Sequence, residues 1–225
     1  MFHNYFILFF FCLLFSCDTD NPKKTKTPSS TKELKINTPL FNADSAFYFI
    51  EKQVSFGPRV ISSSGWKNCA IWLEKKLLQY TPDVIIQEAP VVTYDMKNHV
   101  LKNIIATFSA EKNNRIALFA HWDSRHIADH DSVNQNNPIL GANDGASGIS
   151  ILMVLSEILN KNKLHNLGVD LLFVDGEDMG RSGELENYCI GTTAFCEVIP
   201  DPIPSYAICI DMVADKNPIF PIEYF

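Results

Sequence analysis

Side chains that can bind a metal or carry a proton gather where the apolar runs of this sequence end. They are His121, Asp123, Asp144, Asp175, Glu177, Asp178 and Asp211. Carboxylate and imidazole groups without thiolates are typical of a catalytic zinc site, in which the protein ligands leave one coordination position open. The residue types therefore predict a zinc-assisted reaction in which a neighbouring acid carries the proton.

Each of these residues also has a purely structural interpretation when it is taken alone. Asp144 precedes a helical pattern and could be its N-cap, the DGED stretch at 175–178 could be a solvated turn, and His121 could be a hydrogen-bonded core residue. Asp211 fits this interpretation least, because an acid inside AICIDMV is costly to bury unless it is paired or bound to a metal. We favour a shared site because these groups collect at one edge of a predicted sheet.

The stretch GANDGASG at 141–148 surrounds Asp144 with small residues. Its glycines let the backbone approach closely, and we expect them to leave an open metal position beside the carboxylate uncrowded. Glu177 and Asp178 are adjacent, so both cannot comfortably bind one metal from a strand end. We expect one of them to bind the metal and the other to carry a proton, with a pKa raised by burial and neighbouring acids and lowered by the metal.

The elements that must position these side chains alternate along the chain. Apolar residues that recur at helical spacing after N-cap signals predict helices, and β-rich apolar runs predict strands. The helices are expected at about 42–56, 64–80 and 147–160, and the strands at about 83–94, 99–108, 115–121, 168–177 and 206–213. Strands that are apolar on both faces and alternate with helices indicate an α/β fold, a three-layer α/β/α sandwich with a mixed, largely parallel central sheet.

The composition and the N-terminus indicate an exported protein with one globular domain. The chain has 225 residues, of which 46% are hydrophobic and 20% charged, and its net charge of −7 argues against nucleic-acid binding. Residues 5–15 are a continuous apolar run, too short to span a bilayer and typical of a signal peptide. We therefore predict a signal peptide at 1–16, a flexible tether at 17–38 and a catalytic domain at 39–225.

The cysteines have different predicted roles. The end of the apolar run, LFSC, resembles the lipobox of bacterial lipoproteins and makes Cys17 the expected lipidated residue. The preceding MFHN lacks Lys and Arg, so a plain cleaved signal or an uncleaved anchor stays open as an alternative. The cysteines of the domain, at 69, 189, 196 and 209, lack the CxxC spacing of a structural zinc site. Either Cys189 pairs with Cys196, or all four are buried and reduced.

Residues 57–220 carry an ordered set of motifs: GPR, HWDSRHIADHD, GANDGASGISILMVLSEIL, LLFVDGEDMG and IDMVADKNPIF. As a set they resemble the zinc-dependent glutaminyl cyclases of bacteria, which share their fold with the zinc aminopeptidases. The resemblance implies one zinc ion held by Asp144 and Asp178, with Glu177 as the general acid and base. It also implies that Asp211 belongs to a hydrogen-bond network for proton transfer.

His121 and Asp123 match positions with different roles in the two branches of this superfamily. In the two-zinc peptidases such residues bind or orient a second metal, and in the one-zinc cyclases they lie behind the ligands. In the peptidase interpretation Asp144 would bridge both metals, His121 and Asp211 would complete the second site, and Glu177 would activate a water. The sequence contains every residue type that this interpretation needs.

The third zinc ligand of the family is a histidine well downstream of Asp211, and no histidine follows Asp211 in this sequence. We therefore expect a relative that is truncated at the C-terminus or degenerate, with an incomplete sheet and two carboxylates that alone hold zinc weakly. The remaining candidates for a third ligand are His126, His130 and His165.

The resemblance implies a glutaminyl-peptide cyclotransferase, which converts N-terminal glutamine to pyroglutamate and releases ammonia. Its substrates would be peptides or exported proteins whose signal cleavage exposes glutamine. We expect a monomer held by a lipid anchor in the cell envelope, as a periplasmic or outer-membrane lipoprotein. The HWDSR and ADHD motifs favour a cyclase over a peptidase. A non-catalytic envelope lipoprotein that keeps only the fold stays open as a third interpretation.

Overall fold

The computed structural model describes residues 38–183, 185–198 and 201–220, and the chain from Pro39 onward forms one compact unit. The predicted signal peptide, the lipidation site Cys17 and the tether up to residue 37 lie outside the described residues, so the domain limits stay predictions. None of the helices within the described ranges is long and apolar enough to cross a membrane.

The three expected helices form close to their predicted limits. The helices are α1 (Ala43–Val54), α2 (Ser64–Leu77) and α3 (Ala146–Lys161), to which the structure adds the 3-10 helix η1 (Leu185–Asn187) and α4 (Ile190–Cys196). Asn42 Oδ1 accepts the Ser45 N–H at 3.0 Å. Ser63 Oγ accepts the Trp66 N–H at 3.1 Å. The first two helices therefore begin at side-chain caps that the sequence pattern indicates.

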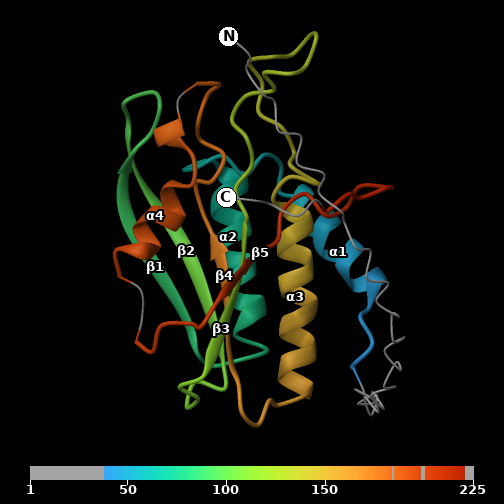
Figure 1. The fold of residues 1–225 in the computed structure, drawn as a ribbon. Helices are drawn as coiled ribbons and strands as arrows, with labels where there is room; N and C mark the ends of the chain where they lie inside the picture. Colours follow the sequence, from blue (N-terminus) through green and yellow to red (C-terminus); the bar gives the residue numbers. More distant parts are fainter. Residues whose placement is uncertain (1–37, 184, 199–200, 221–225) are drawn as a thin grey trace, which may run out of the picture. The chain divides into compact units, whose positions relative to one another are not determined.

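The central sheet is mixed, and its strands lie in the order β1-β2-β4-β3-β5 (Figure 1). The strands are β1 (Val84–Val92), β2 (Asn98–Phe108), β3 (Arg115–His121), β4 (Gly168–Val174) and β5 (Ala207–Cys209). β2 pairs in an antiparallel manner with β1 and β4, whereas β3 pairs in parallel with β4 and β5. The predicted parallel pairing is therefore confined to β3 and its two neighbours.

Helices cover both faces of the sheet, which confirms the predicted three layers. The face toward α1, α2 and α3 is closed by a large apolar cluster, to which α3 contributes the fully buried Ile149 and Leu152. The other face carries a smaller cluster around Ile105 and Leu172, against which Phe195 packs. Phe195 belongs to α4, which lies on this face of the sheet (Figure 1). All residues of β4 are buried, because this strand lies between β2 and β3 and beneath both layers.

The last strand differs from the prediction of a buried strand over 206–213. Only Ala207–Cys209 pairs with β3, and all of its residues are exposed. The physical reason is position, because β5 is the outermost strand of the described sheet. Asp211 lies beyond β5 with a side chain that is 44% exposed, so the cost of burying a charge does not apply to it.

Candidate active site

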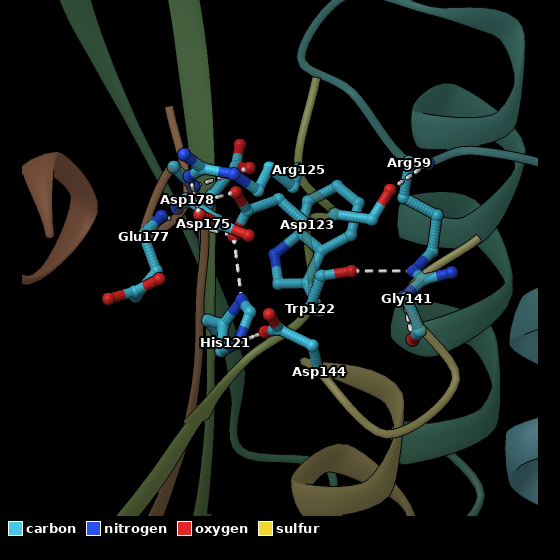
Figure 2. A network of polar contacts seen from close by, with 12 residues as sticks. Arg59, His121, Trp122, Asp123, Arg125, Gly141, Asp144, Asp175, Glu177 and Asp178 are labelled. Atoms are coloured by element: carbon cyan, nitrogen blue, oxygen red, sulfur yellow. Dashed lines mark hydrogen bonds and ion pairs between the residues drawn. The ribbon is translucent and has the colours of Figure 1, made fainter. Parts of the chain in front are cut away.

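The carboxyl ends of β3 and β4 lie side by side, and the segments that follow them carry most of the candidate residues. In the parallel register His121 lies opposite Val174, which brings Asp123 close to the DGED segment after β4. Asp144 joins them from the loop before α3 (Figure 2). Asp211 joins from the segment after β5. The structure thus gathers the predicted acids at one edge of the sheet.

His121 is buried and lies among three carboxylates. Its Nδ1 lies 3.3 Å from Asp123 Oδ1, and its Nε2 lies 2.9 Å from Asp144 Oδ1 (Figure 2). Nε2 also lies 3.4 Å from Asp211 Oδ1. Nε2 is nevertheless satisfied by no hydrogen bond of proper geometry within the described residues. Burial lowers the pKa of His121, but the three carboxylates raise it well above its usual value. The arrangement therefore suits a positive charge, either a proton on the ring or a metal ion beside it.

Asp178 offers a second metal position. Its Oδ1 accepts a hydrogen bond from Arg125 Nη1 at 2.5 Å, whereas its buried Oδ2 has no hydrogen-bond partner in the part of the chain that the structure describes. Burial and the nearby charge of Asp144 raise the pKa of Asp178 to about 7, and Arg125 opposes the shift. A free, buried carboxylate oxygen next to a second acid fits a metal ion held by Asp144 and Asp178.

Asp144 is shared by the two candidate metal positions. On one side it meets His121 and Asp211, and the ligand atoms of these three residues lie within 4.8 Å of one another. On the other side its charge acts on Asp178. Imidazole and carboxylate donors with unsatisfied buried atoms fit zinc at either position.

Asp123 orients other site residues. Its side chain is fully buried, its Oδ1 accepts the Glu177 N–H and its Oδ2 accepts the Asp178 N–H, both at 3.1 Å. The same carboxylate lies against His121 Nδ1. One buried acid therefore holds both the imidazole and the backbone of the two acids after β4.

Glu177 and Asp175 lie in different environments although they are close in sequence. Glu177 is half-buried, and burial raises its pKa while the charge of His121 opposes the shift. Asp175 is completely buried and accepts hydrogen bonds from Trp66 Nε1 and from the Lys102 N–H. Glu177 is therefore the more accessible of the two acids, and Asp175 joins α2 and β2 to the end of β4.

Arg59, which ends the GPR motif, is a site residue that the sequence pattern does not predict. It is fully buried, and it donates through Nε to Trp122 O at 2.8 Å, through Nη1 to Leu140 O at 2.6 Å and through Nη2 to Gly141 O at 2.8 Å (Figure 2). It thereby ties the end of β3 to the loop that carries Asp144. The local signal is a charged residue after Gly-Pro, which does not reveal the carbonyls that it reaches.

Arg125 is the second residue that was not predicted. Besides Asp178, it binds Asp129 through two hydrogen bonds, Nε to Oδ1 at 2.9 Å and Nη2 to Oδ2 at 2.7 Å. Its guanidinium also lies 5.6 Å from the ring centroid of Tyr188. Because these contacts hold it in place, Arg125 supplies a fixed positive charge on the Oδ1 side of Asp178.

The glycines of GANDGASG allow close packing around Asp144. Gly145 has a φ of +83°, and a Cβ at this position would lie 2.7 Å from Asp123 O and 3.0 Å from His121 Cε1. A side chain here would therefore collide with the candidate site. The Asp144 side chain itself remains 30% exposed, so the loop combines close packing with access to the carboxylate.

The histidines considered as a third ligand occupy different places. His126 is buried and stacked on Tyr94, with ring centroids 3.9 Å apart. His130 and His165 are exposed. His165 precedes β4, at the end of the strand opposite to the DGED segment, so the described structure does not bring it to the acids.

The four cysteines in the described ranges are free thiols. Cys69 is buried, but Cys189, Cys196 and Cys209 are exposed, so the prediction of four buried cysteines is wrong. The alternative Cys189–Cys196 disulfide is not formed either, and Cys189 instead lies beside Glu177.

The fold and the acid cluster agree with a comparison of the sequence with known protein families. Residues 103–224 match peptidase family M28. The chain belongs to this family. The matched region of the M28 chain contains all of the candidate ligands and proton carriers described above.

Solved structures that are similar to this M28 chain include glutaminyl cyclases and a peptidase. The glutaminyl cyclase of Bacteroides thetaiotaomicron bound to N-acetylhistamine is 37% identical with a TM-score of 0.77, over 80% of this chain and 65% of that chain. A leucine aminopeptidase precursor from Bacteroides thetaiotaomicron VPI-5482 is 37% identical with a TM-score of 0.77, over 81% and 66% of the two chains. The glutaminyl cyclase of Tannerella forsythia is 38% identical with a TM-score of 0.72, over 78% and 63%.

A curated relative adds a link to zinc. A probable zinc metalloprotease of Leptosphaeria maculans is 29% identical over 181 residues, which cover 73% of this chain and 41% of the relative. The M28 chain thus spans less than two thirds of the length of each of these proteins. The predicted α/β fold and the membership in a family of zinc peptidases and glutaminyl cyclases are confirmed.

Proposed function

We propose that this M28 protein is a zinc-dependent glutaminyl-peptide cyclotransferase, which closes N-terminal glutamine to pyroglutamate and releases ammonia. The observation that carries the proposal is that the half-buried Glu177 adjoins Asp178, whose buried Oδ2 is free of hydrogen bonds from described residues. A metal ligand and a proton carrier are thereby adjacent, as this reaction requires. The similarity to the glutaminyl cyclases of Bacteroides and Tannerella supports this choice within the family.

In this proposal Asp144 and Asp178 hold the zinc ion, and Glu177 moves the proton. When bound, zinc would supply the positive charge that polarises the γ-amide carbonyl of the substrate. Glu177 accepts a proton from the α-amino group as the α-nitrogen bonds to the carbonyl carbon (Cδ) of the γ-amide. It then returns the proton to the amide nitrogen, which leaves as ammonia. The raised pKa of Glu177 suits both transfers, because the same group must take up and release a proton.

His121 and Asp211 form the rest of the proposed proton network. Asp211 lies 3.4 Å from His121 and is 44% exposed, so a substrate can reach it. The contact with His121 lowers the pKa of Asp211, which keeps its carboxylate ionised as a hydrogen-bond acceptor beside the ring. Asp123 keeps the ring in place from the other side.

A two-metal aminopeptidase is the second candidate. It is favoured by His121 Nε2, a buried nitrogen that no described hydrogen bond satisfies and that lies against Asp144 and Asp211. In that case the three residues would hold a second metal ion, and Glu177 would take a proton from the attacking water. The leucine aminopeptidase precursor with 37% identity supports this candidate.

Metal content and product identity separate the two candidates. We expect the zinc-loaded protein to contain one zinc ion and to release ammonia from a glutamine-initiated peptide, leaving a blocked N-terminus. Two zinc ions with release of the N-terminal amino acid would contradict the cyclase and support the peptidase. Glu177→Gln is the control, which should keep its zinc and lose the activity. If neither metal nor product is found, the protein is the non-catalytic member of the three interpretations.

We also propose that the protein acts as a lipid-anchored monomer in the cell envelope, on peptides or exported proteins with N-terminal glutamine. The support is the apolar run at 5–15 followed by LFSC. Detergent phase partitioning of the full chain tests it, because Cys17→Ser should move the protein from the detergent phase to the aqueous phase. A variant that stays in the detergent phase would contradict lipidation at this residue.

A further inference from the structure

Cys189 has a backbone conformation that residues with a side chain rarely adopt. Its φ of 53° and ψ of 26° are left-handed, and it is the N-cap residue of α4, although its side chain makes no capping hydrogen bond. Glycine or asparagine is the usual residue in this conformation, because a Cβ adds strain. Residues in this conformation persist where the surrounding structure holds them and are common at functional sites, so we consider the neighbours of Cys189.

Both the backbone and the thiol of Cys189 contact Glu177. The Cys189 N–H donates to the Glu177 carbonyl at 2.9 Å, and its Sγ–H donates to Glu177 Oε1 at 3.4 Å. The following N–H, that of Ile190, donates to the Gly176 carbonyl at 3.1 Å. The left-handed residue therefore lets successive N–H groups reach the turn after β4 while its thiol reaches the carboxylate.

We propose that Cys189 is a positioning residue, which holds the carboxylate of Glu177 in place for proton transfer. The inference rests on the proposed role of Glu177 as the proton carrier. A half-buried glutamate at the end of a strand has several rotamers within reach. A donor that is anchored to the backbone of the same glutamate favours one of these rotamers. The Glu177 side chain therefore loses less conformational freedom when the reaction occurs.

The thiol of Cys189 acts as a donor and not as a nucleophile. Burial, followed by the charge of Glu177 and the hydrogen bond to it, raises the pKa of Cys189 to about 11. The sulfur therefore keeps its proton near neutral pH, and a thiol is a weak nucleophile. A disulfide with Cys196 would remove the S–H donor, so the proposal requires the free thiol that the structure shows.

Steady-state kinetics of the zinc-loaded full chain test the role of the thiol. We expect Cys189→Ala to lower kcat about fivefold, with KM and zinc content unchanged, because one modest hydrogen bond is lost. Cys189→Ser keeps a donor and should recover most of the rate. Cys196→Ala is the matched control, since Cys196 is also exposed and lies at the far end of α4. Full kcat in Cys189→Ala, or a loss that Cys189→Ser does not recover, would overturn the proposal.

A second measurement does not depend on activity. The alkylation of Cys189 and Cys196 by iodoacetamide is followed by mass spectrometry in the wild type and in Glu177→Gln. We expect Cys189 to react several-fold more slowly than Cys196 in the wild type and to speed up in the variant, while Cys196 keeps its rate. An unchanged Cys189 rate would show that the contact with Glu177 is absent. A Glu177-dependent rate in a protein without any cyclase or peptidase activity would instead refute the proposed function and leave the contact intact.

Discussion

Replacing Arg59 by Lys tests how the loop that carries Asp144 is held. The guanidinium of Arg59 donates to the carbonyls of Trp122, Leu140 and Gly141 at 2.8, 2.6 and 2.8 Å. A Lys ammonium is a compact charge at the end of a different stem, so it cannot reproduce a planar fork and keeps about one of the three contacts. The charge is buried in both proteins, so its desolvation largely cancels in the comparison.

The magnitude follows from the two contacts that are lost. A hydrogen bond from a charged donor contributes about 1.5 kcal/mol, so Arg59→Lys should lower the free energy of unfolding by about 3 kcal/mol. Domains of this kind are stable by only about 5–15 kcal/mol, so this loss is large but leaves the protein folded at low temperature. The substitution should also loosen the loop before α3 locally, because two of the three carbonyls belong to this loop.

The assay is urea unfolding, monitored by the fluorescence of the buried Trp66 and Trp122. Hydrogen exchange of the amides at 140–148 reports the local effect and should become faster in Arg59→Lys. Arg181→Lys is the control, because Arg181 is exposed and a charge remains; it should change stability by less than about 0.5 kcal/mol. A decrease in the free energy of unfolding of less than about 1 kcal/mol in Arg59→Lys, or unchanged hydrogen exchange at 140–148, would refute the role of Arg59 in holding this loop.

Four further predictions concern the site and its surroundings. Gly145→Ala should destabilise the protein by about 2 kcal/mol or more, measured by thermal unfolding, because a Cβ would lie 2.7 Å from a backbone oxygen at positive φ. The Arg125 guanidinium lowers the pKa of Asp129 to about 2. The ionised carboxylate therefore stabilises the folded protein above the unfolded-state pKa of about 3.9, and this stabilisation is lost as the pH falls toward 2. Asp129→Asn should therefore cost up to about 1 kcal/mol near pH 7, and the difference should shrink in urea titrations at lower pH. Asp144→Asn should abolish zinc binding in a chelator competition, whereas Asp211→Asn should keep the zinc and lose turnover; equal loss of zinc in both would favour the two-metal candidate. Chelation should lower the Tm, and added zinc should restore it; an unchanged Tm would show that no ion neutralises the cluster.

Local sequence patterns predict most of the fold and the composition of the site. α3 was expected at 147–160 and is found at Ala146–Lys161, and the run RIALFAH is β3. These predictions succeed because the apolar spacing that specifies a helix or a strand acts within a few residues. The acids gather because parallel strands end at a common edge, which the pattern of β3 and β4 already implies.

The features that the sequence does not predict depend on contacts between segments that are distant along the chain. Arg59 reaches carbonyls at 122 and 140–141, and Arg125 reaches Asp178, but nothing near these arginines in sequence identifies their partners. The exposure of β5 depends on the strand order, which places it outermost. A hydrophobic run in the sequence predicts that a strand forms, but the burial of that strand depends on the neighbouring strands and helices that cover it.

The charge balance at this edge of the sheet favours a metal ion in addition to the fixed cations. The negative groups at this edge are Asp123, Asp144, Asp175, Glu177, Asp178 and Asp211, and the positive groups near them are Arg59, Arg125 and the ring of His121. Burial and then neighbouring acids raise the pKa values of Asp175 and Asp178 despite these cations, so the protein alone does not neutralise the cluster. A divalent ion between Asp144 and Asp178 would remove this penalty where a buried carboxylate oxygen has no described partner. The arginines then have separate roles, because Arg125 holds Oδ1 of Asp178 and Arg59 holds the loop that carries Asp144.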